Sequence, residues 1–242
     1  MLHPELILML LATGIYLYDS LVLLERNEAV VYRDLWGQWS VGFGSNGWKI
    51  GAREPYLPNP LLPHTAQFKL QWQLAGQAAV PKRGAALRDA SHFSALTPFV
   101  LVAAYSLFVL LPLGFFTPLG STMALLAIAS LYGCMSLALM LVYRRRKQFG
   151  LSNRQFVALA FECMACIPLG LNLVRKLARL SPQTADLNYT ATSLLPEHKV
   201  AAYRAACAIR IKDEMDCEAE DSPRMQALQA HLENFAKEEV AP

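Results

Sequence analysis

Two long stretches of this 242-residue chain lack Lys and Arg entirely. All 22 Lys and Arg residues fall between Glu25 and Asp89 or after Tyr143, and the stretches without them, residues 1–24 and 94–143, are the most apolar parts of the chain. Proteins inserted in a bilayer keep their short basic loops on the cytoplasmic side. The asymmetry therefore predicts a membrane protein whose orientation follows from the positions of its basic residues.

Several kinds of catalytic apparatus are also missing from the sequence. There is no Gly-rich phosphate loop and no Ser in a nucleophile-elbow context, which argues against nucleotide hydrolysis and acyl transfer. The five His residues are spread singly, without a second ligand at helix or zinc-knuckle spacing, so no metal site is assigned. No cofactor is predicted. The residues name neither a substrate nor a pathway.

Charge and composition restrict the kind of partner. The net charge of +3 is modest, and the basic residues cluster beside apolar segments instead of forming a basic face interleaved with aromatic residues. This pattern disfavours nucleic acid and favours the anionic headgroups of a lipid bilayer. With 54% hydrophobic and 17% charged residues, the chain is expected to combine membrane helices with sizeable water-facing parts. Its five scattered Cys residues are expected to be free thiols.

Three apolar segments are long enough to cross a hydrocarbon core of about 30 Å at about 1.5 Å per residue. They are residues 6–24, 99–116 and 123–143. Uncharged residues 117–120 join the last two, which are expected to form a tight helical hairpin. The basic residues 144–147 then stop the third span at the cytoplasmic face.

The first apolar segment is expected to be an uncleaved anchor. A signal peptide needs a basic region before its apolar core, whereas this N-terminus carries only His3 and Glu5, and Arg26 and Arg33 come after the core. The positive-inside rule then places the N-terminus outside and the C-terminus in the cytoplasm. A plasma membrane of the bacterial inner-membrane kind is assumed from that rule.

A fourth apolar segment, residues 156–174, is ambiguous because it carries Glu162, Asn172 and a central Pro168. If it crossed the membrane, nine basic residues from Arg175 onward would lie outside. The positive-inside bias favours a segment that lies in the interface or re-enters from the cytoplasmic side. A fourth span stays open as the alternative.

The loop between the first two spans has the alternating pattern of a small β module. Residues 39–43 and 48–52 alternate between apolar and small or polar side chains, and the Asn-Gly pair at 46–47 is a type I′ turn signal. This predicts a hairpin in which Val41 opposes Ala52.

Two more strands are predicted at residues 28–32 and 68–74, where Leu74 ends a strict alternation. The Pro-rich residues 55–63 are expected to form an extended connector, because Pro cannot donate to a ladder. All four Trp residues lie in this loop, which favours a small core or rings at the headgroup level over a ligand-stacking platform.

The tail is expected to be helical in two pieces. Pro196 and Glu197 have the character of a first helical turn, and this helix is predicted to run to about Glu218. After it, apolar residues at spacings of three and four indicate an amphipathic helix whose stripe needs a partner surface. The stripe consists of Met225, Leu228, Leu232 and Phe235. Its partner is either the rest of the chain or another protein.

Two carboxylates in apolar surroundings are candidate functional residues. Asp19 lies inside the first span, where a charge at mid-membrane costs on the order of 3 kcal/mol, although it is close enough to the cytoplasmic end to reach the interface. Glu162 lies near the middle of the fourth segment and faces water if that segment is interfacial. An ion or proton path would require the two to face each other.

Cys163 and Cys166 form a Cys-x-x-Cys pair with Pro168 two residues beyond it. A redox pair near a helix break is one interpretation. No thioredoxin-like pattern of strands and helices surrounds the pair, and apolar helices use Cys and Met as packing residues. Packing is therefore the favoured interpretation.

The predicted fold class is an α-helical integral membrane protein with three transmembrane helices, a fourth interfacial or re-entrant helix, a small antiparallel β module in the first cytoplasmic loop and a helical tail. The corresponding segments are 1–24, 25–95, 96–143, 144–180 and 181–242. The functional hypothesis is a non-catalytic accessory or scaffold subunit of a larger inner-membrane assembly, with a protein partner or a homo-oligomer. The alternatives are a transport component that uses Asp19 and Glu162, and a membrane thiol oxidoreductase that uses Cys163 and Cys166.

Overall fold

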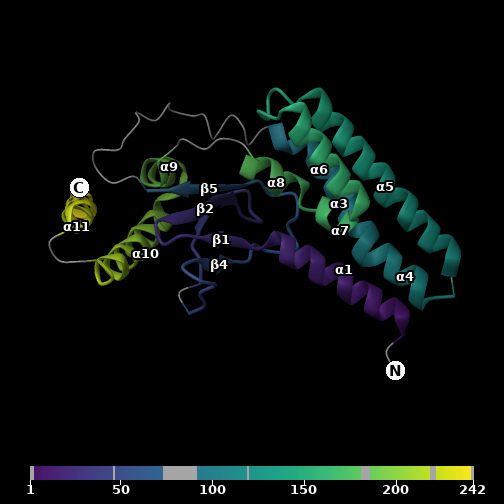
Figure 1. Ribbon diagram of the computed structural model, residues 1–242, viewed down its shortest axis with the longest axis horizontal. Coiled ribbons are helices and arrows are strands. Elements are labelled where there is room, and N and C mark those ends of the chain that lie inside the picture. The colour runs from purple at the N-terminus through teal and green to yellow at the C-terminus, as the bar shows by residue number, and fades with distance from the viewer. Residues whose placement is uncertain are drawn as a thin grey trace. The chain divides into compact units, whose positions relative to one another are not determined.

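The computed structural model describes residues 3–45, 47–72, 92–118, 120–180, 186–218 and 222–240. The chain divides into two compact units, each assembled from three separate segments (Figure 1). Unit 1 comprises Met1–Leu21, Leu57–Gln67 and Leu87–Pro182. Unit 2 comprises Val22–Tyr56, Phe68–Ala86 and Gln183–Pro242.

Unit 1 is helical. Its elements are α1 (Pro4–Ser20), η1 (Ser94–Leu96), α3 (Thr97–Tyr105), the π-helical turn η2 (Ser106–Leu110), α4 (Leu111–Phe116), α5 (Gly120–Arg144), α6 (Asn153–Ala165), α7 (Ile167–Gly170) and α8 (Leu173–Leu180).

Within the described residues, two helices of unit 1 are long and apolar enough to cross a membrane, judged by length and composition. They are Ser94–Phe116, which joins η1, α3, η2 and α4, and Gly120–Arg144, which is α5. Only a third of the most apolar window of each is buried. They match the second and third predicted spans, and the remaining apolar surface suits a lipid environment.

The two apolar helices form the predicted hairpin and pack along each other (Figure 1). Gly114 lies against the backbone of Ala124, where a Cβ on Gly114 would come within 2.6 Å of the Ala124 nitrogen. Farther from the turn, Ser106 Oγ donates to Ser130 Oγ at 2.9 Å. Gly120 starts α5 with a φ of 46°, a left-handed conformation that glycine tolerates. Leu119, part of the predicted turn, lies outside the described residues.

The prediction that the first span runs over residues 6–24 is wrong at its C-terminal end. α1 stops at Ser20, and Val22–Leu24 form strand β1. Val22 and Leu24 alternate into a small core with Val30, and no helical arrangement would put both side chains on that side. Seventeen residues of α1 measure about 26 Å, so α1 is shorter than both apolar helices of the hairpin.

The fourth apolar segment is not one continuous helix. A capping box between Ser152 and Gln155 fixes the start of α6, and the backbone at Cys166 is extended with a φ of −139°. Pro168 in the first turn of α7 suits a new helix start. The break region reaches α5, because Ser136 Oγ lies 3.9 Å from Met164 Sδ and Gly170 packs on Met135.

The described residues of unit 2 form two small sheets. β1 (Val22–Leu24) pairs antiparallel with β4 (Glu54–Tyr56), and a second sheet has the strand order β3–β2–β5. Its strands are β2 (Glu28–Arg33), β3 (Trp39–Gly42) and β5 (Gln67–Gln71). The strands predicted at 28–32 and from Phe68 onward are therefore present, while Leu74 lies outside the described residues.

The predicted hairpin of residues 39–43 with 48–52 is wrong. β3 pairs with β2 instead, so that Val41 opposes Val31 rather than Ala52. The connection from β2 to β3, residues 34–38, is longer than the predicted two-residue turn, but hydrogen bonds from its backbone to the Asp34 side chain organise it, and β2 takes the place beside β3. Asn46 of the predicted turn lies outside the described residues.

The predicted connector 55–63 begins later than expected, because Pro55 belongs to β4. Pro55 opposes Leu23, and its carbonyl accepts a hydrogen bond from Ser45 N at 3.0 Å. β4 has one partner strand in the described sheet, and an edge position tolerates a residue that has no N–H to donate.

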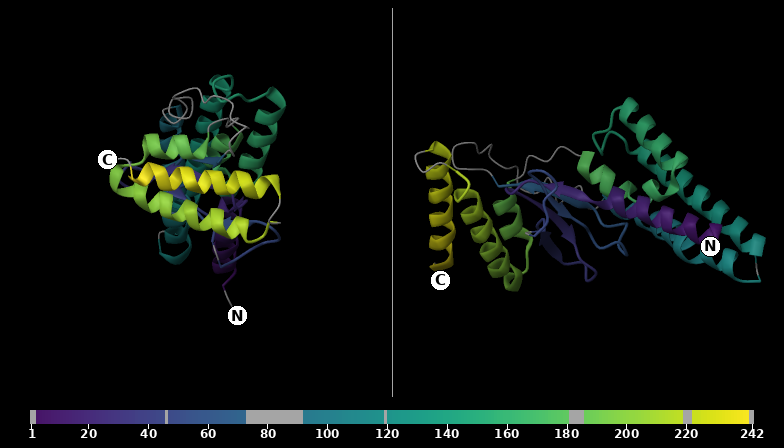
Figure 2. Two further views of the ribbon diagram at one scale, coloured as in Figure 1. Left: turned by 90° about the vertical axis from the view of Figure 1, so that its left-hand side faces the viewer. Right: turned by 60° about the horizontal axis from the view of Figure 1, so that its bottom comes forward.

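The described part of unit 2 also has three helices: α9 (Leu187–Leu194), α10 (Glu197–Met215) and α11 (Pro223–Val240). The prediction of two helical pieces in the tail missed α9, which the Asp186 side chain caps by accepting a hydrogen bond from Tyr189 N. α10 begins where predicted and ends three residues before Glu218. α11 packs on α10 (Figure 2). Buried Leu187, Tyr203, Cys207 and Ile211 form the helical part of the core.

Candidate functional sites

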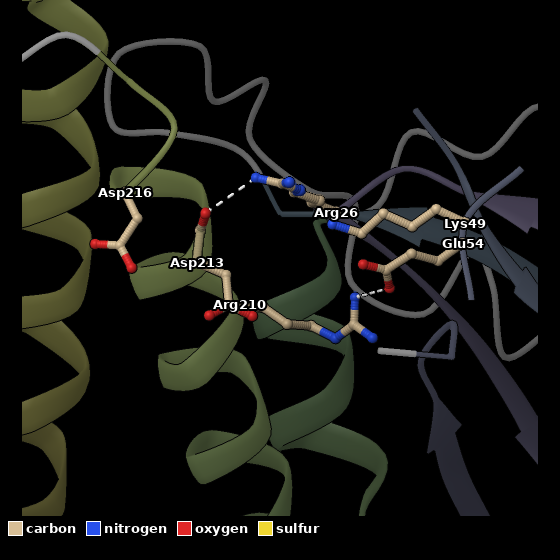
Figure 3. Close-up of a pocket in the computed structure, with 6 residues that line it drawn as sticks. All are labelled: Arg26, Lys49, Glu54, Arg210, Asp213 and Asp216. Carbon is tan, nitrogen blue, oxygen red and sulfur yellow. Dashed lines mark hydrogen bonds and ion pairs between the residues drawn. The ribbon is translucent and has the colours of Figure 1, made fainter. Parts of the chain in front are cut away.

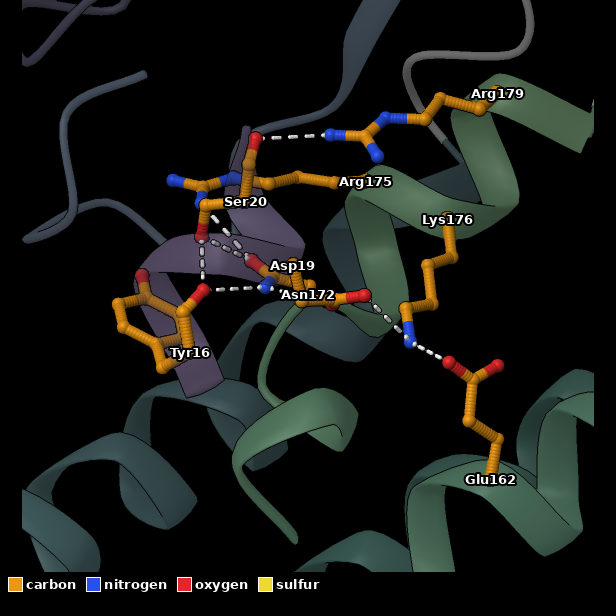
Figure 4. A network of polar contacts seen from close by, with 8 residues as sticks. All are labelled: Tyr16, Asp19, Ser20, Glu162, Asn172, Arg175, Lys176 and Arg179. Atoms are coloured by element: carbon orange, nitrogen blue, oxygen red, sulfur yellow. Dashed lines mark hydrogen bonds and ion pairs between the residues drawn. The ribbon is translucent and has the colours of Figure 1, made fainter. Parts of the chain in front are cut away.

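Unit 1 brings the two predicted carboxylates to one lysine. Lys176 Nζ, on α8, lies 3.2 Å from Asp19 Oδ1 and 2.5 Å from Glu162 Oε1 (Figure 4). The side chains of Asp19 and Lys176 are 17% and 11% exposed, whereas that of Glu162 is 44% exposed. Asp19 and Glu162 are thus bridged by Lys176, which compensates their charge.

Neutral polar groups hold Asp19 from the other side. Asn172 Nδ2 donates to Asp19 Oδ2 at 2.9 Å, and Ser20 Oγ donates to Asn172 Oδ1 at 3.0 Å. Ser20 and Asn172 are fully buried. Buried polar groups are stable when each has a partner, so this arrangement fixes the end of α1 against the start of α8.

Arg175 is fully buried beside this cluster and ties three segments together (Figure 4). Its guanidinium donates to Ser20 Oγ at 2.8 Å and Asn172 Oδ1 at 2.9 Å. It also donates to the carbonyls of Asn59 and Leu62 at 2.8 and 2.9 Å. A fixed fork of five donors makes arginine suited to such a joint. Arg175 therefore positions α1, α8 and the connector around residues 59–62.

A groove of about 380 Å³ opens between α6 and α8, next to the ion triad. Its lining residues are Gln155, Ala158, Leu159, Glu162, Lys176, Arg179 and Leu180. Arg179 donates one hydrogen bond from a terminal nitrogen to Ser20 O at 3.0 Å. Burial lowers the pKa of Arg179, although a guanidinium keeps its charge at neutral pH. The groove thus combines an apolar wall with two cations.

Cys163 of the Cys-x-x-Cys pair has the properties of a packing residue. Both thiols are free, Cys163 is fully buried and Cys166 is half-buried. Burial, the largest cause, raises the pKa of Cys163 to about 12. A reactive cysteine needs a lowered pKa and access to solvent, and Cys163 has neither.

Unit 2 has a polar pocket of about 230 Å³ between α10, β4 and the residues that follow β1 (Figure 3). Arg26, Lys49, Glu54, Arg210, Asp213 and Asp216 line it. Arg210 donates to Glu54 Oε2 and to Gly44 O, both at 2.6 Å, and its guanidinium lies over the Phe43 ring. The lining thus has three basic and three acidic side chains, whose formal charges cancel.

The turn between β2 and β3 presents two exposed apolar side chains. Leu35 is 68% and Trp36 is 86% exposed. Asp34 Oδ1 accepts hydrogen bonds from the backbone nitrogens of Trp36 and Gln38, each at 2.9 Å. Lys199 Nζ donates to Asp34 Oδ2 at 2.7 Å, and this hydrogen bond is the main reason that the pKa of Asp34 lies below its ordinary value. The turn is therefore fastened to α10.

The four Trp residues have different environments. Trp72 is buried and Trp39 is half-buried, as a small core requires, whereas Trp36 and Trp48 are largely exposed.

The residues of the apolar stripe on α11 differ in burial. Met225 and Leu228 are buried and Leu232 is half-buried, while the side chain of Phe235 lies outside the described part of the chain. The buried half of this candidate partner surface thus already packs within unit 2.

Sequence reasoning missed the polar face of α8. Asn172, Arg175, Lys176 and Arg179 have helical spacing, and this pattern could have predicted that they act together. The basic residues of this segment were interpreted only as topology signals. Nothing in the linear sequence showed that Asp19, more than 150 residues earlier, would supply the acid.

Comparisons with protein-family models, curated proteins and solved structures give no match. Within the described ranges, no group of three or more His, Cys, Asp or Glu residues is placed to hold a metal ion. The functional conclusion therefore depends on the geometry of the chain alone.

Proposed function

We propose that this protein is a non-catalytic membrane subunit that anchors unit 2 as an adaptor for a partner protein. The observation that carries the proposal is the turn at Leu35 and Trp36, where two large apolar side chains are exposed on a backbone that Asp34 holds rigid. Exposed, preorganised aromatic residues are favourable contacts in protein interfaces.

The proposed topology has three spans, with α1 crossing in addition to the hairpin of Ser94–Phe116 and α5. α1 runs in the same general direction as α5, and the segment from α3 to α4 runs against them, which suits alternate crossings (Figures 1 and 2). Leu10 and Leu11 on α1 are more than half exposed. A shorter helix is accommodated by local thinning of the bilayer. The basic residues after α5 favour a cytoplasmic C-terminus and an outside N-terminus in a bacterial inner membrane.

The segment from α6 to α8 is proposed to re-enter from the cytoplasmic side. Its break packs on Met135 and Ser136, about 13 Å along α5 from Arg144 at about 1.5 Å per residue. Gln155 and Leu180, at its two ends, line the same groove. A segment with both ends together and its bend beside a span has the form of a re-entrant element.

Purification of the tagged chain from its native membrane in mild detergent, followed by mass spectrometry of bound proteins, tests the adaptor function. We expect a stoichiometric partner that is lost with Trp36→Ser. Trp48→Ser removes another exposed Trp from unit 2 and is the matched control, with the partner retained. A lone protein, or a partner held equally by both variants, would contradict the proposed contact.

The α11 stripe supplies a separate test of the interface. Leu232 is half-buried, so Leu232→Glu perturbs only the end of the stripe that is not already buried in unit 2. We expect the partner to remain bound in this variant. If Leu232→Glu released the partner and Trp36→Ser kept it bound, the interface would lie on α11 and not on the β2–β3 turn.

A transport component is the second candidate, because Asp19, Lys176 and Glu162 form an acid–lysine–acid chain. In that case Asp19→Asn and Glu162→Gln should each abolish an ion- or proton-linked activity of vesicles without lowering membrane abundance. Normal activity in both variants removes this candidate.

A further inference from the structure

The groove between α6 and α8 has both an apolar wall and positive charge, and a site for a small soluble anion would not need the apolar wall. Ala158, Leu159 and Leu180 give it an apolar wall, and Lys176 and Arg179 supply positive charge. Ala158 is exposed in the groove. An occupant that satisfies both parts has an anionic group joined to a hydrocarbon chain.

Of the two cations, Arg179 has the greater capacity for an anion. Lys176 already contacts two carboxylates. Arg179 donates to Ser20 O through one terminal nitrogen, and among the described residues its other terminal nitrogen makes no hydrogen bond. A guanidinium has five N–H donors, which leaves Arg179 with donors to offer a phosphate oxygen.

The residues before the groove add a positive field. Residues 144–161 contain five Lys or Arg and no Asp or Glu. Arg144, Lys147 and Arg154 are exposed, and no ion pair of theirs occurs in the described part of the chain. Gln155, in the first turn of α6, connects this basic stretch to the groove. Basic pockets beside membrane helices on the cytoplasmic side are suited to anionic lipid headgroups.

We propose that this groove binds a phospholipid with an anionic headgroup, its phosphate on Arg179 and Lys176 and an acyl chain along Ala158 and Leu159. Glu162 at the same groove disfavours ligands of high negative charge, which fits a single phosphodiester better than a free phosphate. The proposal depends on the membrane location but not on a protein partner, so it can hold even if the adaptor function is wrong.

Native mass spectrometry of the delipidated full chain in detergent tests the proposal. Phosphatidylglycerol and phosphatidylcholine with identical acyl chains are titrated separately, and inorganic phosphate is added as a competitor. We expect phosphatidylglycerol to bind at least about fivefold more tightly, as one cation near an anionic headgroup provides. Equal affinity for the two lipids, or displacement of phosphatidylglycerol by stoichiometric phosphate, would overturn the lipid assignment.

Two variants separate the headgroup from the chain. Arg179→Gln should abolish the preference for phosphatidylglycerol, whereas Lys212→Gln, which removes an exposed cation from α10, should keep it. Ala158→Trp fills the groove at an exposed position and should weaken both lipids about fivefold or more, for the acyl chain loses apolar contact. Ala129→Trp places the same side chain on an exposed site of α5 and is its control.

Protection of the buried Cys163 thiol from alkylation reports whether unit 1 is folded in each variant. If Arg179→Gln exposes Cys163, that variant is unfolded and the test depends on Ala158→Trp alone. Ala158 is exposed, so its substitution should leave the fold of unit 1 intact. Unchanged lipid binding in a folded Ala158→Trp variant contradicts the proposal.

Discussion

The two units bury an arginine in different ways. Arg175 in unit 1 donates to a hydroxyl, an amide oxygen and two backbone carbonyls. Arg210 in unit 2 donates to the carboxylate of Glu54, and its guanidinium covers the Phe43 ring. Unit 1 thus surrounds its buried cation with oxygen dipoles from three segments, and unit 2 places a counter-charge directly against it.

This difference predicts different responses to substitution. Removal of Arg210 leaves a buried carboxylate without its cation, whereas removal of Arg175 leaves neutral acceptors that have lost a donor. The uncompensated charge is the more costly of the two. The chain also offers separate reporters, because all four Trp residues lie in unit 2, and the buried thiols of Cys163 and Cys207 lie in units 1 and 2 respectively.

The largest effect is expected for Arg210→Met. Loss of one partner from a buried ion pair costs about 3–5 kcal/mol, so the denaturant midpoint of Trp emission should fall strongly while protection of Cys163 changes little. The double variant Arg210→Met and Glu54→Leu should recover most of the loss, since no charge is then left buried. A double variant no more stable than the single one would show that Glu54 is not the source of the cost.

Arg175→Met should destabilise unit 1 by about 2–3 kcal/mol, because buried acceptors lose their donor. The expected result is faster alkylation of Cys163 under partly denaturing conditions. Cys207, whose pKa burial likewise raises to about 12, serves as the reference in the same sample. Equal acceleration at both thiols would mean that the two units do not respond separately.

Within unit 1, the two acids of the ion triad should differ. Asp19→Asn removes a charge from a mostly buried contact and should cost about 1–2 kcal/mol. Glu162→Gln should cost at most about 0.5 kcal/mol, since its side chain is 44% exposed and water screens the pair. Denaturant midpoints of Cys163 protection measure both. A larger effect for Glu162→Gln would show that the exposed arm of the triad is the stronger one.

The smallest effect concerns pH. Burial, followed by the charge of Arg175, lowers the pKa of His64 in unit 1 below its ordinary 6.5. The unfolded chain therefore binds a proton more readily, so this contribution is complete above pH 6.5 and is lost as the pH falls towards the folded pKa. In unit 2, Lys199 lowers the pKa of Asp34, so that contribution is lost only below pH 3.8.

Mild acidification should accordingly weaken protection of Cys163 before it shifts Trp emission. His64→Gln is expected to remove the loss that begins below pH 6.5, where the unfolded chain takes up a proton at His64 more readily than the folded chain does. Lys199→Gln is the counterpart in unit 2 and should alter only the response near pH 3.8. If Cys163 loses protection just below pH 6.5 in the His64→Gln variant as it does in the native chain, the effect belongs to another group.

Local patterns were enough to predict several elements. The apolar helices around residues 99–116 and 123–143, the strands at 28–32 and near Phe68, and the start of α10 at Glu197 all follow from composition, alternation or helix-start signals close in sequence. The hairpin of residues 39–43 with 48–52 was mispredicted, because the Asn-Gly signal says nothing of competing strands: β3 pairs with β2 across the turn that Asp34 organises.

The sequence by itself determined which stretches are apolar enough for a bilayer, where the basic ends lie and where α10 begins, for these properties depend on residues within one or two helical turns of each other. Only the tertiary structure decided that α1 stops at Ser20, that Lys176 joins Asp19 to Glu162, and that Arg179 lines a groove. Each of these depends on contacts between segments more than 10 residues apart, and many such pairings satisfy the same local pattern until the whole unit packs.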